Sequence, residues 1–226
     1  MSTEADGQVS FVVRTRNEER YVGHAIQSIL DFFGTKTHII IVDNESTDDT
    51  LKNVSLFPKR FYNVDKITIG YNEYTPGRSL NMGIEKTNAP IVGILSAHCQ
   101  IRHLVVDDLL TYFNEVGVFG VIGKQIPIYK GKKIHPRYIW SNFCHETPQE
   151  NLVEATEEGR HFFHNAFSFN RRDIWEHTPF DEDLHGKEDR FWADKLVSQG
   201  CKFYLEPDFI CDHNWTQNGA TWINIG

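Results

Sequence analysis

The first half of the chain alternates short apolar runs, rich in β-branched residues, with segments whose apolar residues recur at helical spacing. Each apolar run ends in polar residues, as a buried strand does where a loop begins. After the first run, Val22, Ala25 and Ile29 mark one face of a helix that Gly34 ends. The pattern predicts strands at residues 8–13, 38–42, 67–71, 91–95 and 118–122, and helices at residues 18–33, 46–52, 79–86 and 105–115.

Strands that alternate with helices are typical of a parallel, doubly wound sheet, so we expect an α/β fold. The periodicity fades after Lys124, and residues 129–158 are polar with scattered aromatic residues, as expected for loops over a site. Regular structure returns with a strand at residues 166–169, a helix from Arg171, a helix at 188–199 and a strand at 202–205. We expect one domain over residues 1–226.

Composition narrows the class of protein. With 226 residues, 40% of them hydrophobic, the chain can bury the core of one large domain. Its net charge of -8 argues against a nucleic-acid partner, because such a protein needs a basic face. The four cysteines form no CxxC pair, which favours reduced thiols over a zinc ribbon or a disulfide framework. Because neither a signal peptide nor an apolar run of ~20 residues stands out, we expect a cytoplasmic protein.

Polar residues follow three of the predicted strands at their carboxyl ends, at residues 14–17, 43–45 and 96–98. In open parallel sheets, ligands bind at this edge, where the strand order reverses. A polar loop follows almost any strand, so one cluster alone indicates little; three together favour a binding site. The chain contains neither GxGxxG nor GxxxxGK[ST], which argues against a dinucleotide dehydrogenase and a P-loop enzyme.

Asp43 directly follows an apolar strand, which predicts that its carboxylate points into this crevice. There it can accept hydrogen bonds from a base or a ribose. The alternative is a helix cap, but Ser46 with Asp49 already resembles a capping box. We therefore interpret Asp43 as a ligand-binding residue.

Five motifs, in order and at matching spacing, resemble those of the family 2 glycosyltransferases, inverting enzymes of the GT-A fold, especially those of bacterial surface-polysaccharide synthesis. RTRNE (residues 14–18) is similar to the family's PTYNE, and IVDNESTDDT (residues 41–50) to its VVDDGSTDGT. PGRSLNMG (residues 76–83) resembles GxxxARNxG. FDEDL (residues 180–184) and KED (residues 187–189) resemble FDExL and the ED motif that follows it.

The resemblance implies a role for each motif. It places a nucleotide-sugar-binding half at residues 8–124 and a loop-rich acceptor-binding half at residues 125–226. Asp189 is implied as the catalytic base and Glu188 as the residue that positions the acceptor. A carboxylate at a helix start is also favoured by the helix dipole, so the ED pair alone has a purely structural alternative. The implied donor-binding residues are Thr15, Asn17, Glu18, Asp43, Glu45, Arg78 and Ser96.

One motif departs from the family. Where the family has DxD, which holds a divalent cation against the diphosphate, this chain has Ser96-Ala97-His98. His98 can ligate a metal through imidazole, and His213 matches a family histidine that reaches the metal or the diphosphate. The resemblance thus implies Mn²⁺ or Mg²⁺ as cofactor. The alternative for His98 is a neutral hydrogen-bonding residue.

Aromatic and histidine residues in the second half are candidates for the acceptor site. Trp175 and Trp192 lie in helical segments and fit a core better. The spacing of the histidines matches no common zinc-binding pattern. The predicted acceptor-binding residues are Tyr138, Trp140, His161 and His164.

The resemblance predicts an enzyme that moves a sugar from a nucleoside-diphosphate sugar, with UDP as the default, to a hydroxyl of a glycan or lipid-linked saccharide. Such transfer needs a carboxylate base and positive charge near the leaving diphosphate. Work at the inner face of the cytoplasmic membrane, through peripheral association, is part of the same expectation. The alternatives are an inactive nucleotide-sugar-binding partner protein, which the missing DxD suggests, and a nucleotidyltransferase.

Overall fold

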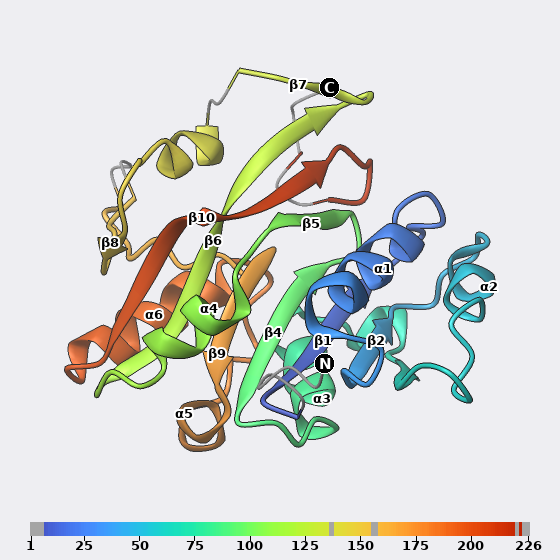
Figure 1. The fold of residues 1–226 in the computed structure, drawn as a ribbon, viewed down its shortest axis with the longest axis horizontal. Helices are drawn as coiled ribbons and strands as arrows, with labels where there is room; N and C mark the ends of the chain where they lie inside the picture. Colours follow the sequence, from blue (N-terminus) through green and yellow to red (C-terminus); the bar gives the residue numbers. More distant parts are fainter. Residues whose placement is uncertain (1–6, 136–137, 155–157, 220–221, 223–226) are drawn as a thin grey trace.

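The computed structural model describes residues 7–135, 138–154, 158–219 and 222 (Figure 1). Their strands form one sheet in the order β3-β2-β1-β4-β9-β6-β10-β5, with β7 paired to β6 and β8 paired to β10. The strands are β1 (Val9–Thr15), β2 (Ile39–Asp43), β3 (Val64–Thr68), β4 (Ile91–Ser96), β5 (Cys99–His103), β6 (Val118–Tyr129), β7 (Lys132–Lys133), β8 (Gln149–Glu150), β9 (Phe167–Arg171) and β10 (Lys202–Asn214).

The sheet is mixed but mostly parallel, as predicted. β1 runs parallel to β2 and β4, β2 runs parallel to β3, and β6 runs parallel to β10. β9 is antiparallel to β4 and β6, and β5 is antiparallel to β10. Since β4 and β6 flank the same reversed strand, they point the same way. The carboxyl ends of β1, β4, β6 and β10 therefore lie toward one edge of the sheet.

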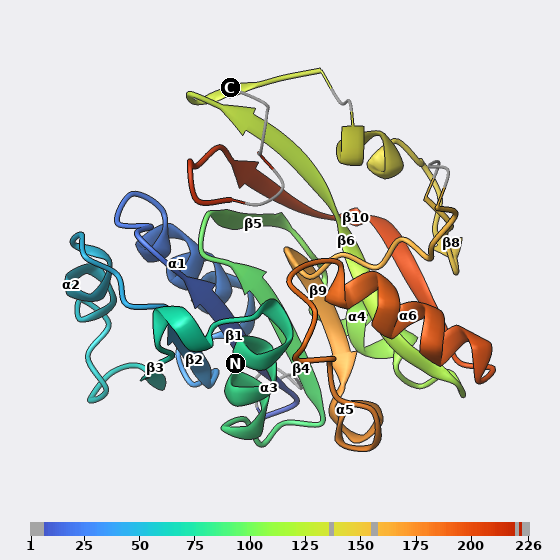
Figure 2. The same cartoon turned by 180° about the vertical axis from the view of Figure 1, so that it is seen from behind.

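Helices cover both faces of the sheet. α1 (Val22–Phe33) and α4 (Val106–Tyr112) lie on one face (Figure 1), and α3 (Pro76–Glu85), α5 (Arg172–His177) and α6 (Glu188–Ser198) lie on the other (Figure 2). Alternate residues of β1 serve the two cores: Phe11 packs in the cluster under α1, and Val12 packs in the cluster under α3. A Cβ at Gly83 of α3 would lie 2.5 Å from Val12, so a glycine there lets the helix approach the sheet closely.

Most predicted elements are confirmed, with shifted boundaries. The strand predicted at residues 67–71 is wrong, because β3 occupies Val64–Thr68 and a 3-10 turn, η1 (Tyr71–Glu73), follows. β3 is an edge strand with alternately exposed side chains, so its sequence lacks a continuous apolar run. The helix predicted at residues 46–52 is instead α2 (Thr50–Val54), which packs beside α1.

The sequence did not predict β5, nor the full lengths of β6 and β10. β5 alternates buried and solvent-facing residues and, among the described strands, pairs with the far half of β10. β10 continues past a bulge between Glu206 and Ile210, where Pro207 suggests that the strand ends. These extensions carry β6 and β10 out to the edge where the polar clusters lie.

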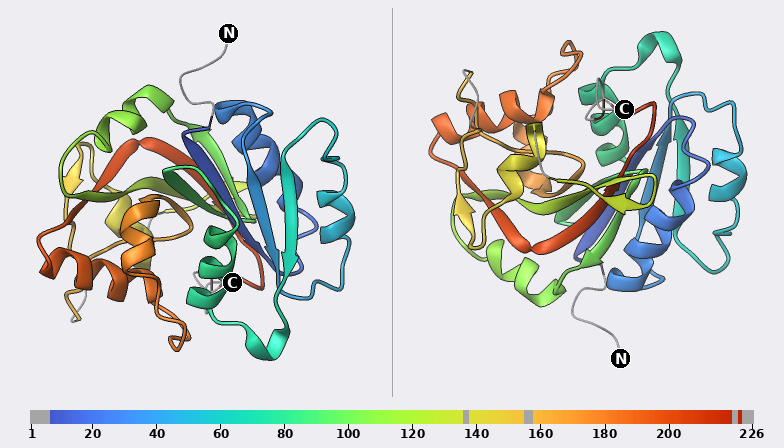
Figure 3. Two further views of the ribbon diagram at one scale, coloured as in Figure 1. Left: turned by 90° about the horizontal axis from the view of Figure 1, so that it is seen from below. Right: turned by 90° about the horizontal axis from the view of Figure 1, so that it is seen from above.

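The two predicted halves share one twisted sheet, as the edge views in Figure 3 show. The boundary predicted at Lys124 falls inside β6. Residues 129–158 contain β7, the 3-10 helix η2 (Tyr138–Phe143) and β8, as well as loops. None of the helices in the described part of the chain has the length and apolar character needed to cross a bilayer.

Candidate active site

A cavity of about 1200 Å³ opens where β1 and β4 end and faces the N-terminus of α6. It therefore lies at the strand edge where the polar clusters predicted a site. The predicted site residues that line it are Thr15, Glu18, Ser96, His98, His164, Glu188 and Asp189. Thr15 Oγ1 and Asn165 Nδ2, both in the cavity lining, are buried atoms with no hydrogen-bond partner among the described residues. Unpaired polar atoms in a cavity wall suit a polar ligand.

One end of the cavity is built by the loops after β1 and β2. Arg16 donates a hydrogen bond of 2.7 Å to Asn44 Oδ1, and its guanidinium lies 4.1 Å from the ring centroid of Tyr71. All three residues line the cavity. The stacked pair gives this end a flat, partly exposed face with nearby polar groups.

Four predicted donor-binding residues lie outside the cavity lining: Asn17, Asp43, Glu45 and Arg78. The carboxylate of Asp43, 1% exposed, accepts hydrogen bonds from Ser46 N (3.1 Å) and Ser46 Oγ (2.6 Å). The prediction of a capping box is therefore wrong, because Ser46 binds Asp43 and α2 begins only at Thr50. In the structure Asp43 holds the loop after β2 in place, and its role in donor binding stays a prediction.

Asn17 and Glu45 also support loops. Asn17 Oδ1 accepts a hydrogen bond of 2.7 Å from Thr47 N, and Glu45 Oε2 accepts one of 2.8 Å from Tyr71 N. Their contacts connect the loops after β1 and β2 and the turn η1. Together they hold the Arg16–Tyr71 face.

His98 and His213, the predicted metal ligands, lie side by side with their Nε2 atoms 3.1 Å apart. His98 follows β4 and lines the cavity, and His213, fully buried on β10, lies behind it. His98 Nδ1 is 3.1 Å from Glu18 Oε1, a carboxylate oxygen that only accepts, so this nitrogen carries the proton. His213 Nδ1 is 2.8 Å from Gln125 Oε1 and carries its proton for the same reason.

When both rings are uncharged, their Nε2 atoms present lone pairs to each other. Two lone pairs at 3.1 Å repel unless a proton or a metal ion lies between or beside them. Two nitrogens bound at right angles, each about 2.1 Å from one metal ion, lie about 3.0 Å apart, so the pair fits one divalent cation. Cys99, the third group of this cluster, fits less well because burial raises the pKa of its thiol well above the usual range.

At the other end of the cavity, Glu188 and Asp189 begin α6, and both are buried. Burial alone raises the pKa of Asp189, but the charge of Arg190, then that of His164, and a hydrogen bond from Asn165 N outweigh it and lower the pKa. Burial and the neighbouring Asp189 charge raise the pKa of Glu188. The two environments thus move the pKa values of the two carboxyl groups in opposite directions, as in many acid–base sites.

Three ion-pair contacts fix this acidic pair. Asp189 Oδ1 accepts a hydrogen bond of 3.0 Å from Arg190 Nη1, and Arg190 Nε lies 3.7 Å from Glu154 Oε2. Glu188 Oε1 lies 3.4 Å from Nη1 of Arg14, at the end of β1. The sequence placed Arg14 in a polar cluster without a role of its own and did not single out Arg190 or Glu154, although all three line the cavity. Arg14 therefore brings a positive charge to the cavity wall, whereas the predicted Arg78 lies outside the lining.

The acceptor predictions have mixed outcomes. Trp140 is wrong as a sugar-contacting residue, because it is 1% exposed and packs against Trp222 with ring centroids 4.4 Å apart. His161 lies outside the lining and pairs with Asp194 at 2.8 Å. His164 lines the cavity, and burial lowers its pKa to about 3. Tyr138 belongs to η2, but its side chain lies outside the described residues.

A sequence profile for glycosyl transferase family 2 matches residues 10–178, which is most of the chain. The chain belongs to this family. Among curated proteins, this family 2 chain is similar to the O-antigen chain rhamnosyltransferase WbaN of Salmonella anatum, at 26% identity over 193 residues. The match covers 80% of the chain and 58% of the rhamnosyltransferase, so the chain spans a little over half the length of that relative.

Solved structures of low sequence identity share the fold. The Staphylococcus aureus protein TarS, residues 1–349 in complex with UDP-GlcNAc, matches with a TM-score of 0.71 at 20% identity, over 94% of this chain and 60% of that one. The mannosyltransferase PcManGT of Pyrobaculum calidifontis, in complex with GDP-Man and Mn²⁺, matches with a TM-score of 0.67 at 19% identity, over 94% of this chain and 58% of that one. The GT-A fold expected from the sequence is confirmed.

Proposed function

We propose that this family 2 chain transfers a hexose from a nucleoside-diphosphate sugar to a hydroxyl of a glycan, with inversion at the anomeric carbon. The observation that carries the proposal is one cavity that is lined by His98, with His213 directly behind it, and by an acidic pair at the start of α6. The complexes of TarS with UDP-GlcNAc and of PcManGT with GDP-Man support a nucleotide-sugar donor. UDP-sugars are our first choice, and dTDP- and GDP-sugars are the next to test.

Asp189 is the proposed base. Its lowered pKa keeps it ionised, and Oδ2, which accepts one hydrogen bond of 3.0 Å from Asn165 N, keeps a lone pair for a proton. It takes the proton of the acceptor hydroxyl as that oxygen forms a bond to the anomeric carbon. The bond from this carbon to the diphosphate oxygen breaks, and the nucleoside diphosphate leaves with the electron pair. Glu188, held by Arg14, faces the same space and positions the acceptor.

We also propose that His98 and His213 hold a divalent cation. The opposed lone pairs and the spacing of 3.1 Å support it, as does the Mn²⁺ in the PcManGT complex. Two imidazoles favour Mn²⁺ over Mg²⁺, which prefers oxygen ligands. When bound, the ion would neutralise charge on the departing diphosphate. Arg14, which lines the same cavity, supplies a second positive charge.

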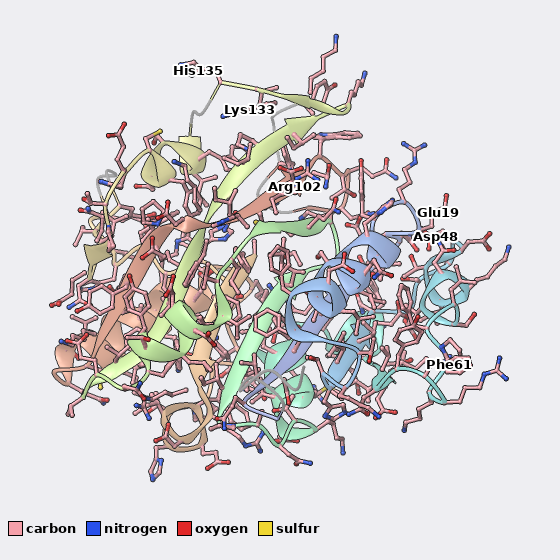
Figure 4. The ribbon with its side chains drawn as sticks, in the orientation of Figure 1. Glu19, Asp48, Phe61, Arg102, Lys133 and His135 are labelled. Carbon is pink, nitrogen blue, oxygen red and sulfur yellow. The ribbon has the colours of Figure 1, made fainter. Side chains whose placement is uncertain are left out.

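The acceptor we propose is a growing surface polysaccharide, free or lipid-linked, at the inner face of the cytoplasmic membrane. The similarity to an O-antigen rhamnosyltransferase supports this context. Three exposed lysines, Lys130, Lys132 and Lys133, gather on the β6–β7 hairpin that projects from the body, where Figure 4 labels Lys133. At about 1 kcal/mol for each basic residue, they would favour anionic lipid. Vesicles with and without phosphatidylglycerol test this: equal sedimentation with both overturns the membrane part.

Release of nucleoside diphosphate tests the function itself. Purified protein is incubated with UDP-, dTDP- and GDP-sugars, Mn²⁺ and an oligosaccharide acceptor extract, and the anomeric configuration of the product is read by NMR. We expect release with one donor and an inverted product. Binding of donor without any turnover favours the inactive-partner alternative. Consumption of a nucleoside triphosphate with release of pyrophosphate favours a nucleotidyltransferase.

A further inference from the structure

Gln125, on β6, lies between His164, which lines the cavity, and the buried His213, and is 2% exposed. Its Oε1 is 2.8 Å from His213 Nδ1, and its Nε2 is 2.9 Å from His164 Nδ1. Both ends of one amide are thus used, each on a different imidazole. No sequence motif pointed to this residue.

The orientation of the amide follows from its neighbours. The backbone N–H of Ala166 donates to His164 Nδ1 at 3.2 Å, so this nitrogen is an acceptor. The group of Gln125 that faces it must therefore be the NH₂ donor, which turns the amide oxygen toward His213. An oxygen there can only accept, so His213 carries its proton on Nδ1 and leaves Nε2 unprotonated. Nε2 is the atom that lies 3.1 Å from His98 Nε2.

We propose that Gln125 is a positioning residue that holds His213 in the tautomer able to bind a divalent cation. The same amide orients His164, which lines the cavity between Gln125 and the acidic pair, so one side chain connects the two ends of the site. The inference rests on the proposed cation site at His98 and His213. Partners that orient metal-binding histidines typically change metal affinity by 10–100-fold.

A purely structural role is the alternative, since any buried amide needs partners. Such a role predicts that removing the amide lowers stability and leaves metal affinity and the His213 tautomer unchanged. The positioning role predicts a change in both. Gln125→Met keeps the length of the side chain but removes donor and acceptor. Gln125→Glu keeps an acceptor for His213, whether its carboxyl group is ionised or not.

The test has two readouts that do not depend on turnover. Calorimetric titration with Mn²⁺ alone is expected to show 10–100-fold weaker binding to Gln125→Met than to the wild type, and near-normal binding to Gln125→Glu. Imidazole ¹⁵N NMR of the metal-free wild type is expected to show a proton on Nδ1 of His213. Thermal unfolding of each variant verifies that it is folded.

The outcomes separate the two proposals. A wild type that binds no Mn²⁺ overturns the cation site, while the NMR spectrum still decides the tautomer. A wild type that binds Mn²⁺, with a folded Gln125→Met that binds it equally well, overturns the role of Gln125. A proton on Nε2 of His213 in the metal-free protein overturns it too, even if the variants do not fold.

Discussion

The guanidinium of Arg14 lies 3.4 Å from the carboxylate of Glu188, so the end of β1 meets the start of α6 across the cavity. Arg14 also donates a hydrogen bond of 3.2 Å to Pro76 O, at the start of α3. One side chain thereby joins the predicted donor half to the predicted acceptor half. Both partners are largely buried, so the pair is shielded from solvent.

Arg14→Met is expected to lower the free energy of unfolding by about 1.5–3 kcal/mol, because Glu188 loses a charged partner in a buried place. Arg14→Lys keeps the positive charge and is the matched control, with a smaller loss. Urea denaturation followed by circular dichroism measures both. Equal stability of the Met variant and the wild type would show that the contact contributes nothing.

Asp189→Asn is expected to slow transfer by about 10²–10⁴-fold, the usual contribution of a general base. Donor affinity stays unchanged, because the altered atoms lie at the acceptor end of the cavity. The matched control is Asp108→Asn, an exposed position on α4 at the other face of the sheet. Initial rates of transfer at saturating donor measure the effect. An Asn variant that keeps more than a third of the wild-type rate would show that Asp189 is not the base.

The buried His164 is expected to make the stability of the folded protein sensitive to acid. Burial lowers its pKa to about 3 in the folded protein, whereas the unfolded chain takes up the proton near pH 6.5. Since the unfolded state binds the proton first as the pH falls, stability declines from pH 6.5 toward pH 3, by at most about 1.4 kcal/mol per pH unit from this group.

His164→Gln removes this contribution but keeps an acceptor for Gln125 and Ala166. The variant's stability is expected to fall less steeply than that of the wild type between pH 6.5 and 4.5. Exposed His24→Gln on α1 serves as control and keeps the wild-type slope. Denaturant titrations at several pH values measure the slopes. Identical slopes for His164→Gln and the wild type would falsify the account.

Gly77→Ala is expected to destabilise the protein and impair transfer. A Cβ at this position of α3 would lie 2.1 Å from the carbonyl oxygen of Asp181, so the loop that leads to Glu188 must shift. Gly23→Ala in α1 is the control: nothing lies within 4 Å of its Cβ, and helix propensity predicts a gain of about 0.5–1 kcal/mol. The melting temperatures of the two variants should therefore move in opposite directions; a lower value for both contradicts the packing argument.

Local patterns could predict much of the fold. The β-branched runs that became β1, β2 and β4 are continuous and buried on both faces, so their sequences are strongly apolar. β5 and the far half of β10 depend on each other for pairing and alternate in burial. A single short segment carries no sign of such a partner, which is why both were missed.

For the site, too, residues in a local motif could be predicted, and residues that depend on distant partners could not. Asp189 and Glu188 follow a recognisable motif at a helix start, and the structure brings both into the cavity. Trp140 looked like an exposed aromatic residue in a loop, but it packs on Trp222, from the end of the chain. Gln125 lies in a strand and acts only through two distant histidines, so no local pattern could have indicated it.

The most direct test of the central claim is a thermal-shift panel of UDP, dTDP, GDP and CMP, each with Mn²⁺, Mg²⁺ or EDTA, on the wild type and His98→Ala. A ligand that binds only the native state raises the melting temperature by mass action. The account predicts that one nucleoside diphosphate stabilises the wild type, more with Mn²⁺ than with EDTA, and that His98→Ala loses the Mn²⁺ increment. No shift with any nucleotide, under any of these conditions, would contradict it.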